Sequence, residues 1–378
     1  MFNKILHLIE PTLTGLSGHE YGYVASLISA NKGFAFDIHV WLGKKASNKD
    51  IVKKLLHINK HSVNIHKYFI RSLRQIQKCF LYYKLLKNNQ ILYICTSGLI
   101  DLIICDLLIK LFFKHDLINK LVFFHFHQFS KNFNKINKLK NISINMKNNV
   151  HVLTTTDNLS NIFREQGFKK VNTIACPSFT PKKLIETLQY DFNKILYAGV
   201  ARSDKGFSII VDTIIEMQAQ HAYLPFVLQV SPPISKRYDP QTALAVAKLQ
   251  QISNSNYKIR LYKHALNAQQ YQDLFVGAIC LLVYDKEQYA DKFSGVTLDA
   301  FYAGCPVITV SDTWMGDITS HFTSGIVLQD PTVINISAAI LQIKERYLYY
   351  HNNAKKAGAY LLKIHDPKHS LQVIYDYL

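Results

Sequence analysis

The chain has 378 residues, of which 48% are hydrophobic and 19% charged, and its formal net charge at pH 7 is +18. This length exceeds what one hydrophobic core usually organises and predicts two domains, and the balanced composition excludes a disordered chain. The six cysteines are scattered without a C-x-x-C pair, which argues for buried thiols in a reducing compartment and against disulfides or a zinc site.

Strands and helices alternate in the first half of the chain, which begins with an apolar strand and shows none of the features of a signal peptide. The longest apolar stretch, 99–113, contains Asp101, Asp106 and Lys110, so no membrane-spanning helix is expected there. The pattern predicts strands at 5–9, 36–42, 91–95, 121–127 and 151–156, helices at 21–30 and 158–167, and a basic helical region over 53–87.

Nearly all of the excess positive charge lies in this first half. Residues 1–180 hold 25 Lys and Arg against 9 Asp and Glu (25 − 9 = +16), whereas 181–378 hold 19 against 17 (19 − 17 = +2). Basic residues alternate with aliphatic and aromatic ones over 53–87 and 131–147, a combination that suits an anionic membrane surface. A compositional bias toward Asn, Lys and Ile is the alternative. Nucleic acid is not an expected partner, because no nucleic-acid-binding motif accompanies the charge.

The second half repeats the alternation after a predicted linker at 175–193, which contains two prolines. Helices are expected at 333–351 and, in two pieces broken near Asp366-Pro367, over 355–378. Strands are predicted at 194–198, 226–230, 258–262, 279–284, 306–310 and 325–328. The whole pattern predicts an α/β fold with two Rossmann-like domains. We expect domains at 1–180 and 190–355, followed by a terminal helical segment at 356–378.

A basic pair follows the first strand of the second domain. The strand ends at Gly199, and Arg202 and Lys205 come three and six residues later. Ligands of open α/β sheets bind at the carboxyl ends of the strands. Arg can grip phosphate oxygens through two parallel N–H bonds, and Lys adds a point charge. We therefore expect both side chains to contact a phosphate-bearing ligand.

A second motif runs from Asp291 to Asp299. Ser294 is a good N-cap for a helix that begins at Gly295 and stops at Gly304, ahead of Pro306. The free amides of Gly295 and Val296 would bind an anion at the positive end of the helix dipole. Asp299 lies one turn deeper on the same face, where a carboxylate could accept hydrogen bonds from sugar hydroxyls.

These two motifs, in this order, resemble those of the family-4 retaining glycosyltransferases of the GT-B fold. The segment with Asp291, Gly295 and Asp299 matches the family's acid, seven-residue gap, acid signature, although both acids here are Asp rather than Glu. The segment around Arg202 and Lys205 matches its strand–Gly–Arg–x–x–x–Lys–Gly element, although Arg202 does not follow the glycine directly. The resemblance implies two Rossmann-like domains around a cleft, with the last helix returning to the first domain.

The resemblance also implies roles for individual residues. Asp299 would hold the ribose of a nucleotide-sugar donor, Asp291 would lie at the transferred sugar, and Arg202, Lys205, Ser294, Gly295 and Val296 would bind the diphosphate. The absence of a D-x-D motif, together with these positive groups, argues for a reaction that needs neither a metal nor another cofactor.

Two further sites in the first domain remain open between a functional and a structural reading. Gly15 and Gly18 flank a strand-to-helix turn and could let a donor phosphate approach the backbone, or could simply form the turn. His125 and His127 share one face of a strand. No third metal ligand accompanies them, so the default is a structural role. The resemblance favours His127 as a contact of the transferred sugar.

The preferred hypothesis is therefore a metal-independent glycosyltransferase of hexosyltransferase type. It would move a sugar from a nucleotide diphosphate to a glycan or lipid-linked acceptor in cell-surface polysaccharide or lipopolysaccharide synthesis. We expect it in the cytoplasm, peripheral on the inner face of the cell membrane. The alternatives are a nucleotide-sugar epimerase or hydrolase of the same fold, and a non-catalytic protein that binds carbohydrate or nucleic acid.

Overall fold

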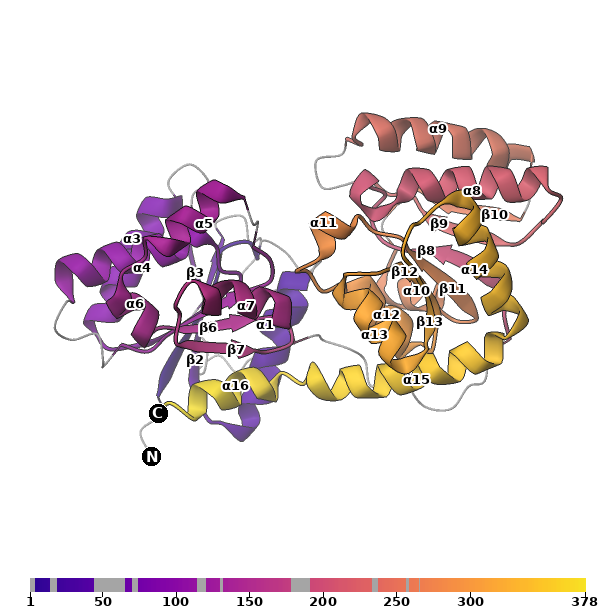
Figure 1. The fold of residues 1–378 in the computed structure, drawn as a ribbon. Coiled ribbons are helices and arrows are strands. Elements are labelled where there is room, and N and C mark those ends of the chain that lie inside the picture. Colours follow the sequence, from indigo (N-terminus) through magenta and orange to yellow (C-terminus); the bar gives the residue numbers. More distant parts are fainter. Residues whose placement is uncertain are drawn as a thin grey trace. The chain divides into compact units, whose positions relative to one another are not determined.

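The computed structural model describes residues 4–13, 19–43, 65–69, 74–113, 120–129, 132–177, 191–232, 237–255, 258–264 and 266–378. The chain folds into two compact units, one formed by Met1–Thr180 together with Ile364–Leu378 and the other by Pro181–Lys363. Each unit is a parallel sheet with helices on both faces (Figure 1). The α/β class with two Rossmann-like units is confirmed.

The first unit contains a seven-stranded parallel sheet among its described residues, with strand order β3-β2-β1-β4-β5-β6-β7. Its strands are β1 (Ile5–Glu10), β2 (Asp37–Gly43), β3 (Ile65–Phe69), β4 (Ile91–Ile94), β5 (Val122–Phe126), β6 (His151–Thr154) and β7 (Lys170–Thr173). Its helices are α1 (His19–Ala30), α3 (Arg74–Lys87), α4 (Leu99–Phe112), α5 (Phe133–Lys140), α6 (Ile144–Asn149), α7 (Asp157–Glu165) and α16 (Lys368–Tyr375).

Alternate strand residues pack against different helices. Leu92 and Phe124 belong to the core that α3, α4, α6 and α7 cover. The neighbouring residues Phe123 and His125 face the other side, where Tyr23 of α1 and Tyr377, just beyond α16, contact them. Helix α16 packs against α1, so the C-terminal helix returns to the first unit.

The second unit contains a six-stranded parallel sheet among its described residues, with strand order β10-β9-β8-β11-β12-β13. Its strands are β8 (Lys194–Tyr197), β9 (Phe226–Gln229), β10 (Ile259–Tyr262), β11 (Ala278–Leu282), β12 (Val307–Val310) and β13 (Gly325–Leu328). Its helices are α8 (Phe207–Ala219), α9 (Pro240–Ser255), α10 (Ala268–Asp273), α11 (Lys286–Tyr289), α12 (Gly295–Tyr302), α13 (Trp314–Phe322), α14 (Val333–Glu345) and α15 (Tyr347–Ile364).

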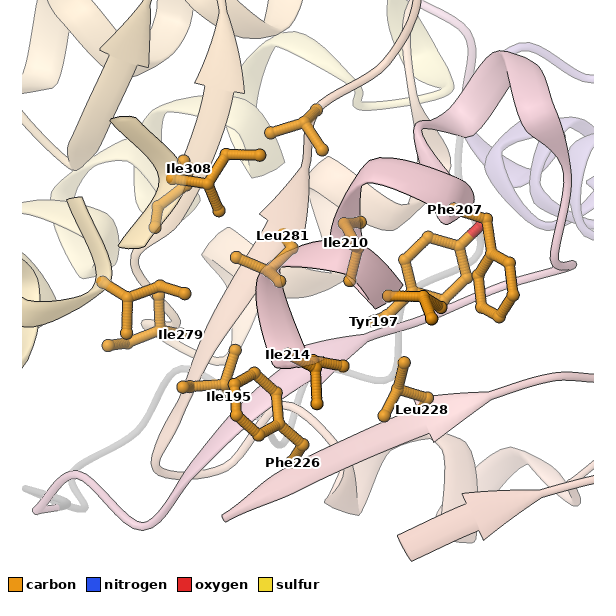
Figure 2. Packing of buried hydrophobic residues seen from close by; sticks show 14 of the residues in the cluster. Ile195, Tyr197, Phe207, Ile210, Ile214, Phe226, Leu228, Ile279, Leu281 and Ile308 are labelled. Atoms are coloured by element: carbon orange, nitrogen blue, oxygen red, sulfur yellow. The ribbon is translucent and has the colours of Figure 1, made fainter. Parts of the chain in front are cut away.

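One face of this sheet forms a continuous apolar core with α8, α9 and α14. Figure 2 shows Ile210 and Ile214 of α8 lying over Ile195 of β8, Phe226 of β9 and Leu281 of β11. The inner strands β11 and β12 are buried along their whole length and are mostly apolar, as expected of strands that are covered on both faces. This packing fixes the carboxyl ends of β8 and β11, and the loops that follow them.

Three sequence predictions differ from the structure. The expected basic helical region over 53–87 contains β3, and its described helix is α3 alone. Strand β7 was not predicted. The helix expected over 333–351 divides at Arg346 into α14 and α15, and α15 then runs to Ile364, so that the helix containing residues 356–363 belongs to the second unit.

Candidate functional site

The strand order of the second unit defines one place where a ligand can enter. The chain proceeds outward from β8 to β10 on one side and from β11 to β13 on the other, so the connections diverge between the neighbours β8 and β11. Crevices of open α/β sheets form outside the carboxyl ends of strands at such a switch point. The loops after β8 and β11 meet there, because the amide of Asp285 donates to the carbonyl of Asp204 over 3.0 Å.

Gly199 shapes the loop that follows β8. Its φ of +95° is favourable only for glycine. Its amide donates to Oε1 of Gln229, at the end of β9, over 2.8 Å. A Cβ placed on Gly199 would lie 3.3 Å from Nζ of Lys205 and 3.5 Å from Cγ2 of Val296. Gly199 therefore lies between the basic loop and the first turn of α12, two elements about ninety residues apart in sequence.

Lys205 is half-buried at this point. Its ammonium lies 5.3 Å from the ring centroid of Tyr284, which follows β11. Burial, together with the nearby charge of Arg202, lowers the pKa of Lys205 to about 8. A desolvated cation of this kind is strongly stabilised by an incoming anion. Lys205 lies where the sequence predicted it, at the carboxyl edge of the sheet.

Arg202 is more exposed than Lys205 and already has a partner. Its guanidinium donates from Nε to Oδ1 of Asp204 over 2.7 Å and forms a second, shorter bond to Oδ2. Tyr289 also contacts the Asp204 carboxylate. The sequence did not predict that Asp204 would hold the guanidinium in this loop, and a phosphate would have to share or replace that interaction.

Helix α12 begins as expected. The Ser294 hydroxyl accepts a hydrogen bond from the amide of Thr297 and caps the helix. The amides of Gly295 and Val296 precede Thr297, the first residue whose amide donates within the helix, and remain available. Gly295 is exposed, and a Cβ added there would meet nothing within 4 Å, so open space lies beside the first residue of the helix. The arrangement can bind an anion at the helix N-terminus.

Asp299 lies one turn further along α12. Burial raises its pKa to about 7, and a hydrogen bond from the hydroxyl of Tyr271, on α10, opposes that rise. Asp299 and Lys205 both act electrostatically on the thiol of Cys280, in β11, so the acid and the base both lie near this strand. Sequence analysis missed Tyr271, because no local pattern links α10 to α12.

Asp291 is buried in the loop that precedes α12, and its charge acts on Lys292 together with the charges of Asp204 and Arg202. The structure thus brings together Arg202, Lys205, Ser294, Gly295, Val296, Asp299 and, in the preceding loop, Asp291. Gly15 and Gly18 lie outside the described residues.

His127 belongs to the first unit, one residue beyond β5. Its Nε2 donates to the carbonyl of Cys95 over 2.9 Å, and its Nδ1 lies 3.9 Å from Sγ of Cys176. His125 is fully buried, with Nδ1 hydrogen-bonded to the hydroxyls of Tyr23 and Tyr93. Burial lowers the pKa of His125 well below its usual value, as expected of a neutral structural histidine.

The first unit has its own switch point, between β1 and β4. Glu10, at the end of β1, is fully buried there. One carboxylate oxygen accepts from the Thr12 amide over 3.1 Å, and the other from the Thr96 hydroxyl over 2.5 Å. Burial raises the pKa of this carboxyl. Sequence analysis did not single out Glu10.

Two classes of site are absent from the part of the chain that the structure describes. Within it, no three His, Cys, Asp or Glu side chains are grouped so that they could hold a metal ion. None of its helices combines the length and the apolar character needed to span a bilayer.

The chain was compared with known proteins. No protein-family model and no curated protein matches it. Among solved structures it is similar to a glycosyltransferase from Rickettsia africae, with a TM-score of 0.71 and 13% identity over 100% of this chain and 99% of the other.

Two further solved structures are similar over nearly the whole chain. Anabaena HepE (Alr3699) in complex with UDP gives a TM-score of 0.67 at 15% identity, covering 99% of this chain and 98% of the other. The lipopolysaccharide outer core galactosyltransferase WaaB, in its apo form, gives 0.67 at 13%, covering 99% and 100%. At these identities the similarity establishes the fold, and the chain has the GT-B fold along its full length.

Proposed function

We propose that this protein is a glycosyltransferase that moves a sugar from a nucleotide-diphosphate sugar to a hydroxyl acceptor. The observation that carries the proposal is the switch point of the second unit. There Lys205 and the open N-terminus of α12 flank Gly199, and Asp299 lies one helical turn deeper. The GT-B fold supports it, as does the UDP bound by HepE, which makes a UDP-sugar our first choice of donor.

In this proposal each group acts on one part of the donor. Lys205, Arg202 and the amides of Gly295 and Val296 bind the diphosphate and stabilise the negative charge that grows on it as the bond to the sugar breaks. The carboxylate of Asp299 accepts hydrogen bonds from the ribose hydroxyls, and the Tyr271 hydroxyl holds that carboxylate in place. These cationic and dipolar groups neutralise the leaving group without a metal or other cofactor.

We further propose hexosyl transfer with retention of configuration. The acceptor hydroxyl would then enter on the face from which the diphosphate leaves. Asp291 would lie at the transferred sugar, as the motif around it implies, and His127 would contact that sugar from the first unit. The acceptor would be a glycan or a lipid-linked glycan.

The proposed setting is cell-surface polysaccharide or lipopolysaccharide synthesis, on the inner face of the cell membrane. Two observations support it. Lipopolysaccharide is the named substrate of WaaB, one of the structural neighbours, and most of the excess positive charge of this chain lies in residues 1–180. Anionic lipid attracts such a surface.

Transfer of radiolabelled sugar into a membrane or glycan fraction tests the activity, after thermal-shift screening with UDP, GDP, ADP and CMP has selected the nucleotide. We expect Lys205→Ala and Asp299→Ala to reduce transfer by about tenfold to a hundredfold each, because each loses a charge-assisted contact. Lys248→Ala, on the outer face of the unit, is the matched control and should retain full activity.

Undiminished transfer by both site variants would refute the assignment of the site. Loss of the nucleotide-sugar without any acceptor would identify an epimerase or hydrolase instead. Absence of nucleotide binding, with salt-sensitive binding of oligonucleotides, would identify a non-catalytic nucleic-acid-binding protein.

A further inference from the structure

The solvent-facing side of α4 is aliphatic where a surface helix is normally polar. Ile100, Ile103, Leu107 and Leu111 follow one another at intervals of three and four residues, so they form one stripe. Each is between 38% and 64% exposed. The opposite side of α4, including Leu102 and other core residues, is buried against the sheet. The helix is therefore apolar on both sides, although only one side is buried against other described residues of the chain.

Neighbouring helices extend this stripe into a broad surface. Helix α3 adds Ile76 and Phe80, which are 56% and 72% exposed. Nine of the nineteen large exposed hydrophobic residues among the described parts of the chain lie on α3, α4, α5 and α6. They are Ile76, Phe80, Ile100, Ile103, Leu107, Leu111, Phe112, Phe133 and Ile144. We call these nine residues the α3–α6 face. The four helices lie together at one side of the first unit (Figure 1).

Buried polar contacts join three of these helices, α3, α4 and α6. The carboxylate of Asp101, on α4, accepts from Nζ of Lys78 over 2.6 Å and from the hydroxyl of Tyr82 over 2.8 Å, both on α3. Asp106, also on α4, accepts from the amide of Ser143 over 3.2 Å, directly before α6. The exposed apolar residues are thus displayed by a rigid scaffold.

The charge on these helices has a single sign. The only acidic side chains on α3, α4, α5 and α6 are Asp101 and Asp106, and both are buried in the contacts just described. Every exposed charged side chain on the four helices is a lysine: Lys84, Lys87, Lys110, Lys135, Lys138 and Lys140. The four helices therefore expose aliphatic residues and lysines but no carboxylate. Such a surface is complementary to a partner that has an apolar interior and an anionic exterior.

We propose that the α3–α6 face docks onto an anionic lipid monolayer, with its aliphatic side chains among the acyl chains and its lysines at the headgroups. A second copy of this chain fits the face poorly, because two such faces would oppose lysine to lysine. The proposal deepens the proposed function, since it brings the enzyme to a lipid-linked acceptor. Lipid binding itself requires no transfer chemistry, so the two can fail separately.

Co-sedimentation of the full-length protein with sucrose-loaded vesicles tests the proposal. The probes are vesicles of phosphatidylcholine alone and of phosphatidylcholine mixed with phosphatidylglycerol. We expect binding to the anionic vesicles only, weakened by high salt. Leu107→Ser combined with Leu111→Ser should lower the partition coefficient by about tenfold. Replacement of Lys135 and Lys138 by Gln should lower it by about fivefold for each lysine.

Matched controls separate docking from folding and from donor binding. Leu244 and Ile334 lie on the second unit and are 62% and 78% exposed, so their double replacement by Ser should leave vesicle binding unchanged. Melting temperatures should be equal in the α3–α6 face variants and the Leu244 and Ile334 control, because every side chain replaced in them is exposed. Lys205→Ala should bind vesicles as the wild type does, even though it binds the donor more weakly.

Three outcomes would overturn the proposal. The wild type could remain in the supernatant with anionic vesicles, or the apolar variants could bind as strongly as the wild type. The wild type could also form dimers that the apolar variants lose, without any vesicle binding. That last result would assign the face to contact between copies of the chain.

Discussion

Asp299 is a carboxylate that the fold holds at a cost in stability. It lies half-buried on α12, where desolvation raises its pKa from 3.8 to about 7, against the opposing effect of the Tyr271 hydrogen bond. In the unfolded chain the same carboxyl titrates near its ordinary value. Replacement of Asp299 by Asn removes the ionisation but keeps an oxygen that can accept from Tyr271.

The sign of the effect follows from proton linkage. Between about pH 4 and pH 7 the folded protein retains a proton on Asp299 that the unfolded chain has released, so the free energy of unfolding falls as pH rises. Each unit of pKa difference is worth about 1.4 kcal/mol. The rise from 3.8 to about 7 therefore costs about 4 kcal/mol once Asp299 is fully ionised. Asp299→Asn does not incur this loss.

Thermal melting of both proteins between about pH 4 and pH 8 measures the difference. We expect equal melting temperatures near pH 4 and a gain for Asp299→Asn that grows to about 10 °C at pH 8, the shift that such an energy produces in a unit of this size. In Tyr271→Phe the decline in stability should continue to higher pH, because the hydrogen bond that lowers the pKa of Asp299 in the folded protein is gone. Parallel melting curves, or a less stable Asn variant at pH 8, would refute the reasoning.

Three other predictions concern different residues. Gly295→Leu should keep the melting temperature and lose UDP binding in calorimetry, because its side chain would fill open space at the proposed site. Gly206→Ala should lose about 1–3 kcal/mol of stability or more in urea melts, because the residue has a φ of +69° and the new Cβ would lie 2.1 Å from a carbonyl oxygen. The opposite pattern would contradict the assignment of the site. UDP affinity should fall as pH rises through 8, since Lys205 then loses its charge, and a flat profile between pH 7 and 9 would exclude that role. Asp101→Asn should destabilise the first unit by about 3–5 kcal/mol in urea melts, because it leaves the buried ammonium of Lys78 without its counter-charge. An unchanged transition would show that the ion pair contributes nothing to stability.

Most strands of both sheets were predictable from the sequence, because strands buried on two faces read as continuous apolar runs. The strands that were missed, β3 and β7, are the two edges of the first sheet. Residues at such edges have a neighbouring strand on one side only. The edge strand β7 is accordingly half-exposed and reads Lys-Val-Asn-Thr, which carries no apolar pattern. The break between α14 and α15 was missed because neither glycine nor proline marks it.

In the candidate site, too, local interactions were predictable from the sequence and long-range interactions were not. The limits of α12 were predictable, since Ser294 caps the helix through an amide only three residues away and Gly304 ends it. The partners of the site residues were not. Tyr271 contacts Asp299 from a different helix. Asp204 forms an ion pair with Arg202, although nothing in the local sequence marks Asp204 as more than a solvent-exposed acid. Contacts of this kind are determined by packing, which a linear pattern does not encode.

Calorimetric titration of UDP into the wild type, Lys205→Ala, Asp299→Asn and the control Lys248→Ala tests the central claim most directly. That claim is that the switch point between β8 and β11 binds the diphosphate and ribose of a sugar donor. We predict one site per chain in the wild type and in Lys248→Ala, with affinity about tenfold to a hundredfold weaker in each of the other two variants. Equal affinity in all four proteins, or no binding to the wild type by UDP or any other nucleoside diphosphate, would contradict it.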